Sequence, residues 1–190
     1  MTRSQRPSKA DLLAAQGKTI HDVIAHNLDV LFCGINPGLY SGYTGHHFAR
    51  PGNRFWPAIH AAGFTDRLLT PAEEQEMLRF GLGITNLVAR ATATAADSTY
   101  AQIVRLAQRL VAKVNTFCPR VVAVLGVTAY RAAFDQPRAT LGPQPGGLGG
   151  AALWVLPNPS GLNAHYTPAA LAQVYREFRL AVAENSPSAQ

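Results

Sequence analysis

Three runs of apolar residues constrain the fold of this chain more than any other feature of its sequence. They span Val30–Cys33, Val121–Leu125 and Ala152–Leu156, with a weaker fourth candidate at Ile84–Val88. Polar residues do not alternate within the three runs, which is typical of strands that are buried on both faces of a parallel sheet. Such a sheet needs a layer of helices on each face.

Helix signals fall between the predicted strands. Thr70–Glu73 combines a capping Thr, a Pro at the first helical position and a Glu at the third. The sequence also predicts helices over residues 53–62, 103–117 and 168–182. This alternation predicts a three-layer α/β/α fold with a short, mostly parallel central sheet. Pro143–Gly150 is rich in Gly and Pro and is expected to form a loop or a tight hairpin.

The length and composition indicate one globular domain. The chain has 190 residues, of which 47% are hydrophobic and 15% charged. We expect an amino-terminal helical extension over residues 1–28, with Ser8 as a helix cap, the main domain over 29–184 and a polar tail over 185–190. The net charge of +6 suggests a polyanionic partner such as nucleic acid, although charge alone does not decide this.

Cysteine content and hydropathy exclude several classes of protein. Cys33 and Cys118 are the two cysteines of the chain, too few for a four-cysteine iron–sulfur or zinc site. The adjacent His46 and His47 do not make a metal site without further ligands, so no metal or cofactor is expected. No apolar stretch is long enough to span a membrane, and Met1–Asp22 is too polar for a secretory signal. A cytoplasmic protein without a membrane partner is therefore expected.

Two Asn-Pro turns follow predicted strands. Gly34–Leu39 reads GINPGL and Asn158–Asn163 reads NPSGLN. Because parallel strands end at the same edge of a sheet, the two turns are expected to face each other across a ligand cleft. The Asn36 carboxamide does not titrate and cannot act as a general base, but it can orient a water molecule. One Asn-Pro-Gly turn alone is ordinary, and it is the second turn that favours a ligand site.

Four motifs in the same order resemble one family. FCGINPGL at 32–39, NRFW at 53–56, GITNLV at 83–88 and LPNPSGL at 156–162 look like the mismatch-specific uracil-DNA glycosylases, relatives of the thymine-DNA glycosylases within the uracil-DNA glycosylase superfamily. The resemblance runs from about Asp29 to Leu180 and implies hydrolysis of the N-glycosidic bond of a uracil flipped out of double-stranded DNA. The implied substrate is uracil mispaired with guanine, with other modified pyrimidines as further candidates. The implied enzyme is a monomeric, monofunctional DNA repair glycosylase without a cofactor.

The resemblance also implies roles for individual residues. Asn36 matches the residue that positions the attacking water, and Phe48 matches the aromatic side chain that stacks on the flipped base. Leu162 matches the wedge that enters the duplex where the base has left. The other implied pocket residues are Ile35, Gly38, Ser41, Tyr43 and Asn158. The other residues implied to contact DNA beside the wedge are Ser160, Gly161 and Asn163.

One departure from the better-known uracil glycosylases concerns the catalytic carboxylate. Those enzymes carry an Asp where this chain has Asn36. Asp66, Glu73, Glu74 and Glu76 lie around a predicted surface helix. Asp97 follows the second predicted strand and precedes the long helix, so it either caps that helix or reaches the cleft and assists the water.

Two other functions remain open on the sequence alone. The same turns would suit a small-molecule enzyme that holds a nucleotide or a phosphate. Separately, Gly126–Thr128 at a helix start either cradles a phosphate, such as one of DNA, or forms an ordinary strand–helix turn. A binder of damaged DNA without catalytic activity is the other alternative.

Overall fold

The computed structural model describes residues 6–91 and 100–184, which form a five-stranded sheet in the order β2-β1-β3-β5-β4. The β1–β2, β1–β3 and β3–β5 pairs are parallel, and β4 pairs antiparallel with β5. The predicted short, mostly parallel sheet is therefore confirmed. The strands are β1 (Val30–Gly34), β2 (Leu82–Asn86), β3 (Val121–Leu125), β4 (Gly142–Leu148) and β5 (Ala151–Leu156).

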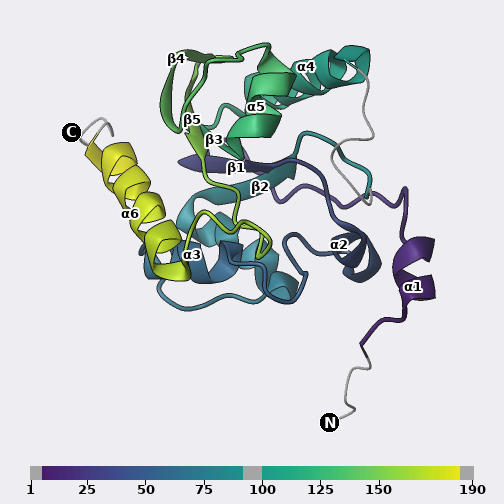
Figure 1. Cartoon of the computed structure of the whole chain (residues 1–190). Helices are drawn as coiled ribbons and strands as arrows, with labels where there is room; N and C mark the ends of the chain where they lie inside the picture. Colours follow the sequence, from purple (N-terminus) through teal and green to yellow (C-terminus); the bar gives the residue numbers. More distant parts are fainter. Residues whose placement is uncertain (1–5, 92–99, 185–190) are drawn as a thin grey trace.

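Helices cover both faces of the sheet (Figure 1). One face carries α4 and α5, and the other carries α3 and α6. The helices are α1 (Lys9–Ala14), α2 (Leu39–Thr44), α3 (Phe55–Ala61), the 3₁₀ helix η1 (Pro71–Phe80), α4 (Tyr100–Phe117), α5 (Val127–Phe134) and α6 (Pro168–Glu184). Within the described residues, no helix has both the length and the apolar character to cross a membrane.

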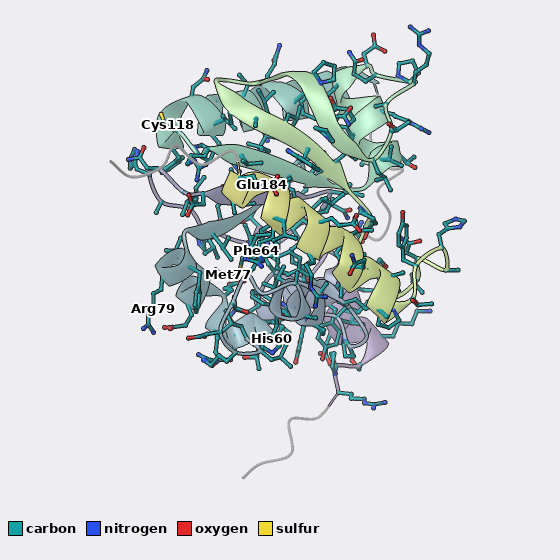
Figure 2. All side chains as sticks on the ribbon, turned by 90° about the vertical axis from the view of Figure 1, so that its left-hand side faces the viewer. His60, Phe64, Met77, Arg79, Cys118 and Glu184 are labelled. Carbon is teal, nitrogen blue, oxygen red and sulfur yellow. The ribbon has the colours of Figure 1, made fainter. Side chains whose placement is uncertain are left out.

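Successive residues of each central strand enter two different cores. Phe32 packs in the core beneath α3 and α6, where its ring contacts Phe55 and Tyr175. The next residue, Cys33, lies in the second core beneath α4 and α5. Figure 2 shows the two layers from the side, with Phe64 and Met77 on the α6 side and Cys118 at the end of α4. Both faces of β1 are therefore dry, which explains its continuous apolar run.

Capping signals mark two helix starts as the sequence predicts. The Thr70 hydroxyl and backbone N–H both donate to the Glu73 carboxylate, at 2.8 and 2.9 Å. These bonds and Arg67 lower the pKa of Glu73 to about 2. Ser8 and Asp11 form the same type of capping box at α1. The helix that begins after Thr70 is a kinked 3₁₀ helix, with a non-helical conformation at Glu73 itself.

The Gly- and Pro-rich segment forms the edge strand β4. Of the two conformations expected for it, the structure has the hairpin, which turns at Gly149–Gly150 into β5. Pro143 and Pro145 lack a backbone N–H, and an edge strand tolerates this because one side of it needs no partner. The pairing with β5 is irregular between Gln144 and Leu148.

The segment that follows α1 packs against β2 as extended chain. Val23 and Ile84 exchange two backbone hydrogen bonds, at 2.9 and 2.8 Å. Asp22 accepts from the hydroxyl of Thr85 at 2.8 Å and pairs with Lys113 of α4 at 2.5 Å. These contacts bring Ile20 to the carboxyl edge of the sheet, where it lines a cavity.

Candidate functional site

A cavity of about 210 Å³ lies at the carboxyl edge of the sheet. Gly34 at the end of β1 is in register with Asn86 at the end of β2, and Leu125 of β3 is in register with Leu156 of β5. The two Asn-Pro turns continue from β1 and β5 and both line this cavity. Its lining includes Ile35, Asn36, Gly38, Ser41, Phe48, Asn86, Asn158 and Ser160.

The first turn is held by the chain that leaves β2. The N–H of Leu87 donates to Gly34 O at 2.9 Å, and that of Val88 donates to Ile35 O at 2.8 Å. The next residue, Asn36, is half-buried, and its Nδ2 lies 3.4 Å from Pro37 O. Parallel pairing thus extends past the end of β1 and places the Asn36 carboxamide at the cavity wall.

Phe48 lines the cavity from an unusual backbone conformation. Its φ is +52°, a left-handed value that a bulky side chain rarely adopts. The ring stacks on Phe55 with centroids 4.2 Å apart. On either side of Phe48, the His47 N–H donates to Glu74 at 2.7 Å and the Ala49 N–H donates to the Ser41 hydroxyl at 3.2 Å. Strained residues that are held in this way concentrate at functional sites.

His47 fixes the orientation of a second carboxamide, that of Asn86. The His47 Nε2–H donates to the carbonyl of His21 at 3.0 Å, so the ring is left with Nδ1 as an acceptor. Asn86 Nδ2 donates to that Nδ1 at 3.1 Å. Burial lowers the pKa of His47, which favours the neutral ring that this arrangement requires. The Asn86 oxygen then lies on the side of Gly34, and Asn86 is part of the cavity lining.

Gly34 lies where any side chain would collide with the cavity wall. A Cβ on Gly34 would lie 2.4 Å from Asn86 Oδ1 and 3.3 Å from the ring of Phe48. The absence of a side chain therefore lets the carboxamide and the ring approach the end of β1 together.

Glu74 corrects one expectation from the sequence. The sequence predicts that Glu74 lies on a surface helix, but in the structure Glu74 is buried, with only 6% of its surface exposed. Its carboxylate accepts from the His47 N–H and lies 3.1 Å from Nδ1 of His46. The partners are 27 and 28 positions away in the sequence, so no local pattern indicates this contact.

The second turn is ordered by hydrogen bonds among its own residues. The Asn158 Oδ1 accepts from Ser160 N–H at 2.9 Å, and the Ser160 hydroxyl accepts from Leu162 N–H at 3.2 Å. Asn163 Nδ2 donates to Asn158 O at 3.0 Å. The Leu162 side chain is 74% exposed, the largest value among the exposed large apolar residues of the described chain.

Two further cavities flank this exposed leucine. One of about 210 Å³ lies between Arg50–Asn53 and Ser160–Leu162. The other, of about 560 Å³, reaches from Gly126 and Thr128 at the start of α5 to Leu162 and His165. The candidate phosphate cradle of the sequence thus lies beside the second turn.

Several residues singled out in the sequence lie elsewhere. Tyr43 is exposed on α2 and does not line the cavity. Asp97 lies outside the described residues. Residues that the sequence did not assign to the pocket, among them Arg50 and Asn53, do line it. Asn86 also lines the cavity, and the signal for it in the sequence is a polar residue at the carboxyl end of a strand, within GITNLV. No group of three or more His, Cys, Asp or Glu side chains within the described parts could hold a metal ion.

Comparisons with known proteins agree with this fold. The sequence model of the uracil DNA glycosylase superfamily matches residues 21–179. The structure is similar to the solution NMR structure of a candidate uracil DNA glycosylase from Methanosarcina acetivorans, with a TM-score of 0.51 and 16% sequence identity. That match covers 86% of this chain and 98% of the other.

Proposed function

Because this chain belongs to the uracil DNA glycosylase superfamily, we propose that it is a monofunctional DNA repair glycosylase that removes uracil mispaired with guanine from double-stranded DNA. The observation that carries the proposal is the pairing of a cavity at the carboxyl edge of the sheet with an exposed Leu162 on the facing loop. A base taken out of a duplex needs a pocket to enter, and the duplex needs an apolar side chain in its place. The protein would act as a monomer.

Base recognition would use Phe48 and Asn86. The Phe48 ring offers a flat face to a flipped base, and Phe55 supports its other side. The Asn86 oxygen suits the N3–H donor of uracil, while cytosine has an acceptor at that position. The Asn86 NH₂ group donates to neutral His47. Rotating the amide so that this NH₂ group faced the N3 acceptor of cytosine would break that hydrogen bond and cost free energy.

Bond cleavage would depend on positioning and on charge stabilisation. A water held by Asn36 adds its oxygen to C1′ as the C1′–N1 bond breaks, and the bonding electrons leave with the base. The pyrimidine anion that forms is stabilised by backbone N–H groups at the cavity wall. The proton that the water releases passes to this anion, either directly or by way of a carboxylate. No lysine lines the cavity among the described residues, which supports hydrolysis rather than Schiff-base chemistry.

Asp97 is the proposed carboxylate that assists this water, with helix capping as its other role. The variant Asp97→Asn distinguishes these two roles. If Asp97 takes the proton, the acidic limb of the pH–rate profile disappears in Asp97→Asn. If Asp97 only caps α4, the variant keeps the wild-type activity and profile.

A screen of base release tests the function as a whole. Duplexes containing U·G, U·A or T·G, and single-stranded uracil DNA, are incubated with the protein, and free base and abasic sites are measured. Release from U·G supports the proposal. Tight binding without release indicates a binder of damaged DNA, and neither binding nor release indicates a small-molecule enzyme.

Asn36→Ala tests the mechanism. We expect single-turnover release to fall about 100-fold or more, because the water loses its positioning group. Affinity for uracil DNA, measured by fluorescence anisotropy, should stay close to that of the wild type. Full activity in this variant contradicts the mechanism.

A further inference from the structure

We infer that Arg54 is a positioning residue that holds the loop of residues 158–166, here named the wedge loop, in its working shape before DNA binds. The inference rests on the proposed function, because it assigns to Arg54 a part in base replacement. Arg54 precedes α3 and does not line the base cavity. Its effect on the reaction would therefore pass through the wedge loop, which carries the exposed Leu162.

One guanidinium group contacts three backbone carbonyls of the wedge loop. Arg54 Nη2 donates to Ser160 O at 2.5 Å and to Asn163 O at 2.9 Å. Arg54 Nη1 donates to Tyr166 O. These three acceptors lie on both sides of Leu162 in the sequence. Arg54 thus holds the backbone on both sides of Leu162 and leaves the Leu162 side chain exposed.

Backbone contacts from the same segment add to this attachment. The Arg54 N–H donates to Pro159 O at 2.9 Å. Gly161 packs so closely on the neighbouring Gly52 that a Cβ on Gly161 would lie 2.4 Å from Gly52 O. Residues 52–54, which precede α3, therefore form a packing surface for the wedge loop, here named the seat, and Arg54 makes the main polar contacts between the two.

The charge of Arg54 is not used in an ion pair. Among the described residues no carboxylate pairs with it, and its Nε is buried without a hydrogen-bond partner. Partial burial of an unpaired cation is costly. The planar fork of arginine offsets this cost with several carbonyl contacts at fixed angles, a geometry that the ammonium of lysine does not reproduce.

An ordered wedge loop favours base replacement for an entropic reason. A loop that orders only when DNA binds loses conformational freedom at that moment, and this loss weakens binding and insertion. In this chain the ordering accompanies folding, since Leu162 is already exposed on a loop whose carbonyls are bound. Loosening the loop should therefore slow excision mainly by displacing Leu162, so most of the loss should disappear once Leu162 is removed.

The test is a double-mutant cycle between Arg54→Lys and Leu162→Ala. In single-turnover excision from a U·G duplex, we expect Arg54→Lys to lower the rate about tenfold or more in the wild-type background and less than about threefold in the Leu162→Ala background. The matched control is Arg179→Lys, since Arg179 also donates to a backbone carbonyl, Ala62 O at 2.8 Å, but between α6 and α3. This control should leave excision unchanged.

Amide hydrogen exchange gives a readout that does not depend on catalysis. Exchange in residues 158–166 should rise about tenfold or more in Arg54→Lys, with the sheet unaffected. If Arg54→Lys does not fold, Gly161→Ala disturbs the same seat and should show the same loss and the same dependence on Leu162. Equal losses in both backgrounds, or unchanged exchange, overturn the inference. A wild-type protein that releases no uracil contradicts the proposed function, and exchange then still decides whether Arg54 holds the loop.

Discussion

Among individual side chains, His47 has the most consequential protonation state. His47 Nδ1 accepts a hydrogen bond from the Asn86 amide, and a proton on Nδ1 would make it a donor instead. The Nδ1–H of His47 and the NH₂ group of Asn86 would then face each other. The Asn86 amide would have to turn over, which would bring its NH₂ group toward the cavity. A neutral His47 is thus a condition for the orientation of Asn86 that the proposed recognition of uracil requires.

His47 should make stability depend on pH. Its pKa is lowered in the folded protein, so below about pH 6.5 the unfolded chain binds a proton that the folded chain does not. The free energy of unfolding should therefore fall as the pH drops below this value, by at most about 1.4 kcal/mol per pH unit from this group. Urea denaturation at several pH values should show a smaller fall in His47→Gln. An identical pH dependence would show that His47 titrates normally.

Gly34→Ala should damage the pocket with little effect on the fold. The new Cβ would press on Asn86 and Phe48, and overpacking of this kind costs about 1–3 kcal/mol. Because the displaced groups are those proposed to bind the base, we expect kcat/KM for uracil release to fall about tenfold or more. Thermal unfolding should remain cooperative in the same variant. Wild-type kcat/KM would mean that the Asn86 oxygen is not used.

The sequence identified these side chains unevenly. The resemblance pointed to Asn36 and Phe48, and the structure places both at the cavity. It gave no role to His47 or Glu74, because their contacts join segments that are distant in the chain. Burial and pairing of this kind arise only when the layers pack, so no local pattern of residue types contains them.

Among the helices and strands, η1 supports the strained loop that carries Phe48. Glu74 on η1 binds the backbone N–H of His47, next to the residue with positive φ. The loop is thus attached to a helix that itself lies outside the cavity. The conformation of Phe48 depends on this attachment.

Glu74→Ala should destabilise the protein measurably. It leaves the buried His47 N–H without its acceptor, which costs about 1–3 kcal/mol in the free energy of unfolding. Glu76→Ala on the same helix removes an exposed pair with Arg79 and should cost less than about 1 kcal/mol. Denaturant titration measures both variants. Equal small effects would show that Glu74 does not hold the loop.

The elements themselves were largely predictable, and the exceptions have physical reasons. Continuous apolar runs predicted β1 and β3, which are buried on both faces, and β5, which is buried on one face and partly exposed on the other. The strand β4 was not distinguished from a loop, because its Gly and Pro residues are poor strand formers that only an edge position tolerates. The short α2 was not predicted, since its sequence LYSGYT carries Gly42 within the helix.

For the molecule as a whole, the net charge of +6 supports a salt-dependent interaction with DNA. If the interface neutralises about four phosphates, affinity should fall roughly 100-fold between about 50 and 200 mM salt. Arg50 lines both the base cavity and the cleft beside Leu162, so Arg50→Ala should reduce the slope of log Kd against log salt by about one. Anisotropy titrations measure the slope. An unchanged slope would mean that Arg50 does not contact phosphate.

The three-layer fold and the edge that carries the site could be predicted, whereas the cavity could not. The mostly parallel sheet and the shared carboxyl edge follow from the pattern of apolar runs, whereas the strand order is known from the structure. The cavity volume and its lining depend on how Gly34, Phe48 and Asn86 approach one another across three segments. Such approach distances are set by packing of the complete core.

The prolines of β4 have a consequence for how copies of this protein meet. An exposed edge strand is a template on which another chain can add a strand, the usual first step of aggregation. Pro143 and Pro145 remove two donors from that edge, and its irregular pairing with β5 makes it a poor template. At the opposite edge, β2 is already paired with Val23. Features at both borders of the sheet thus disfavour the addition of further strands, which should oppose edge-to-edge association at high concentration.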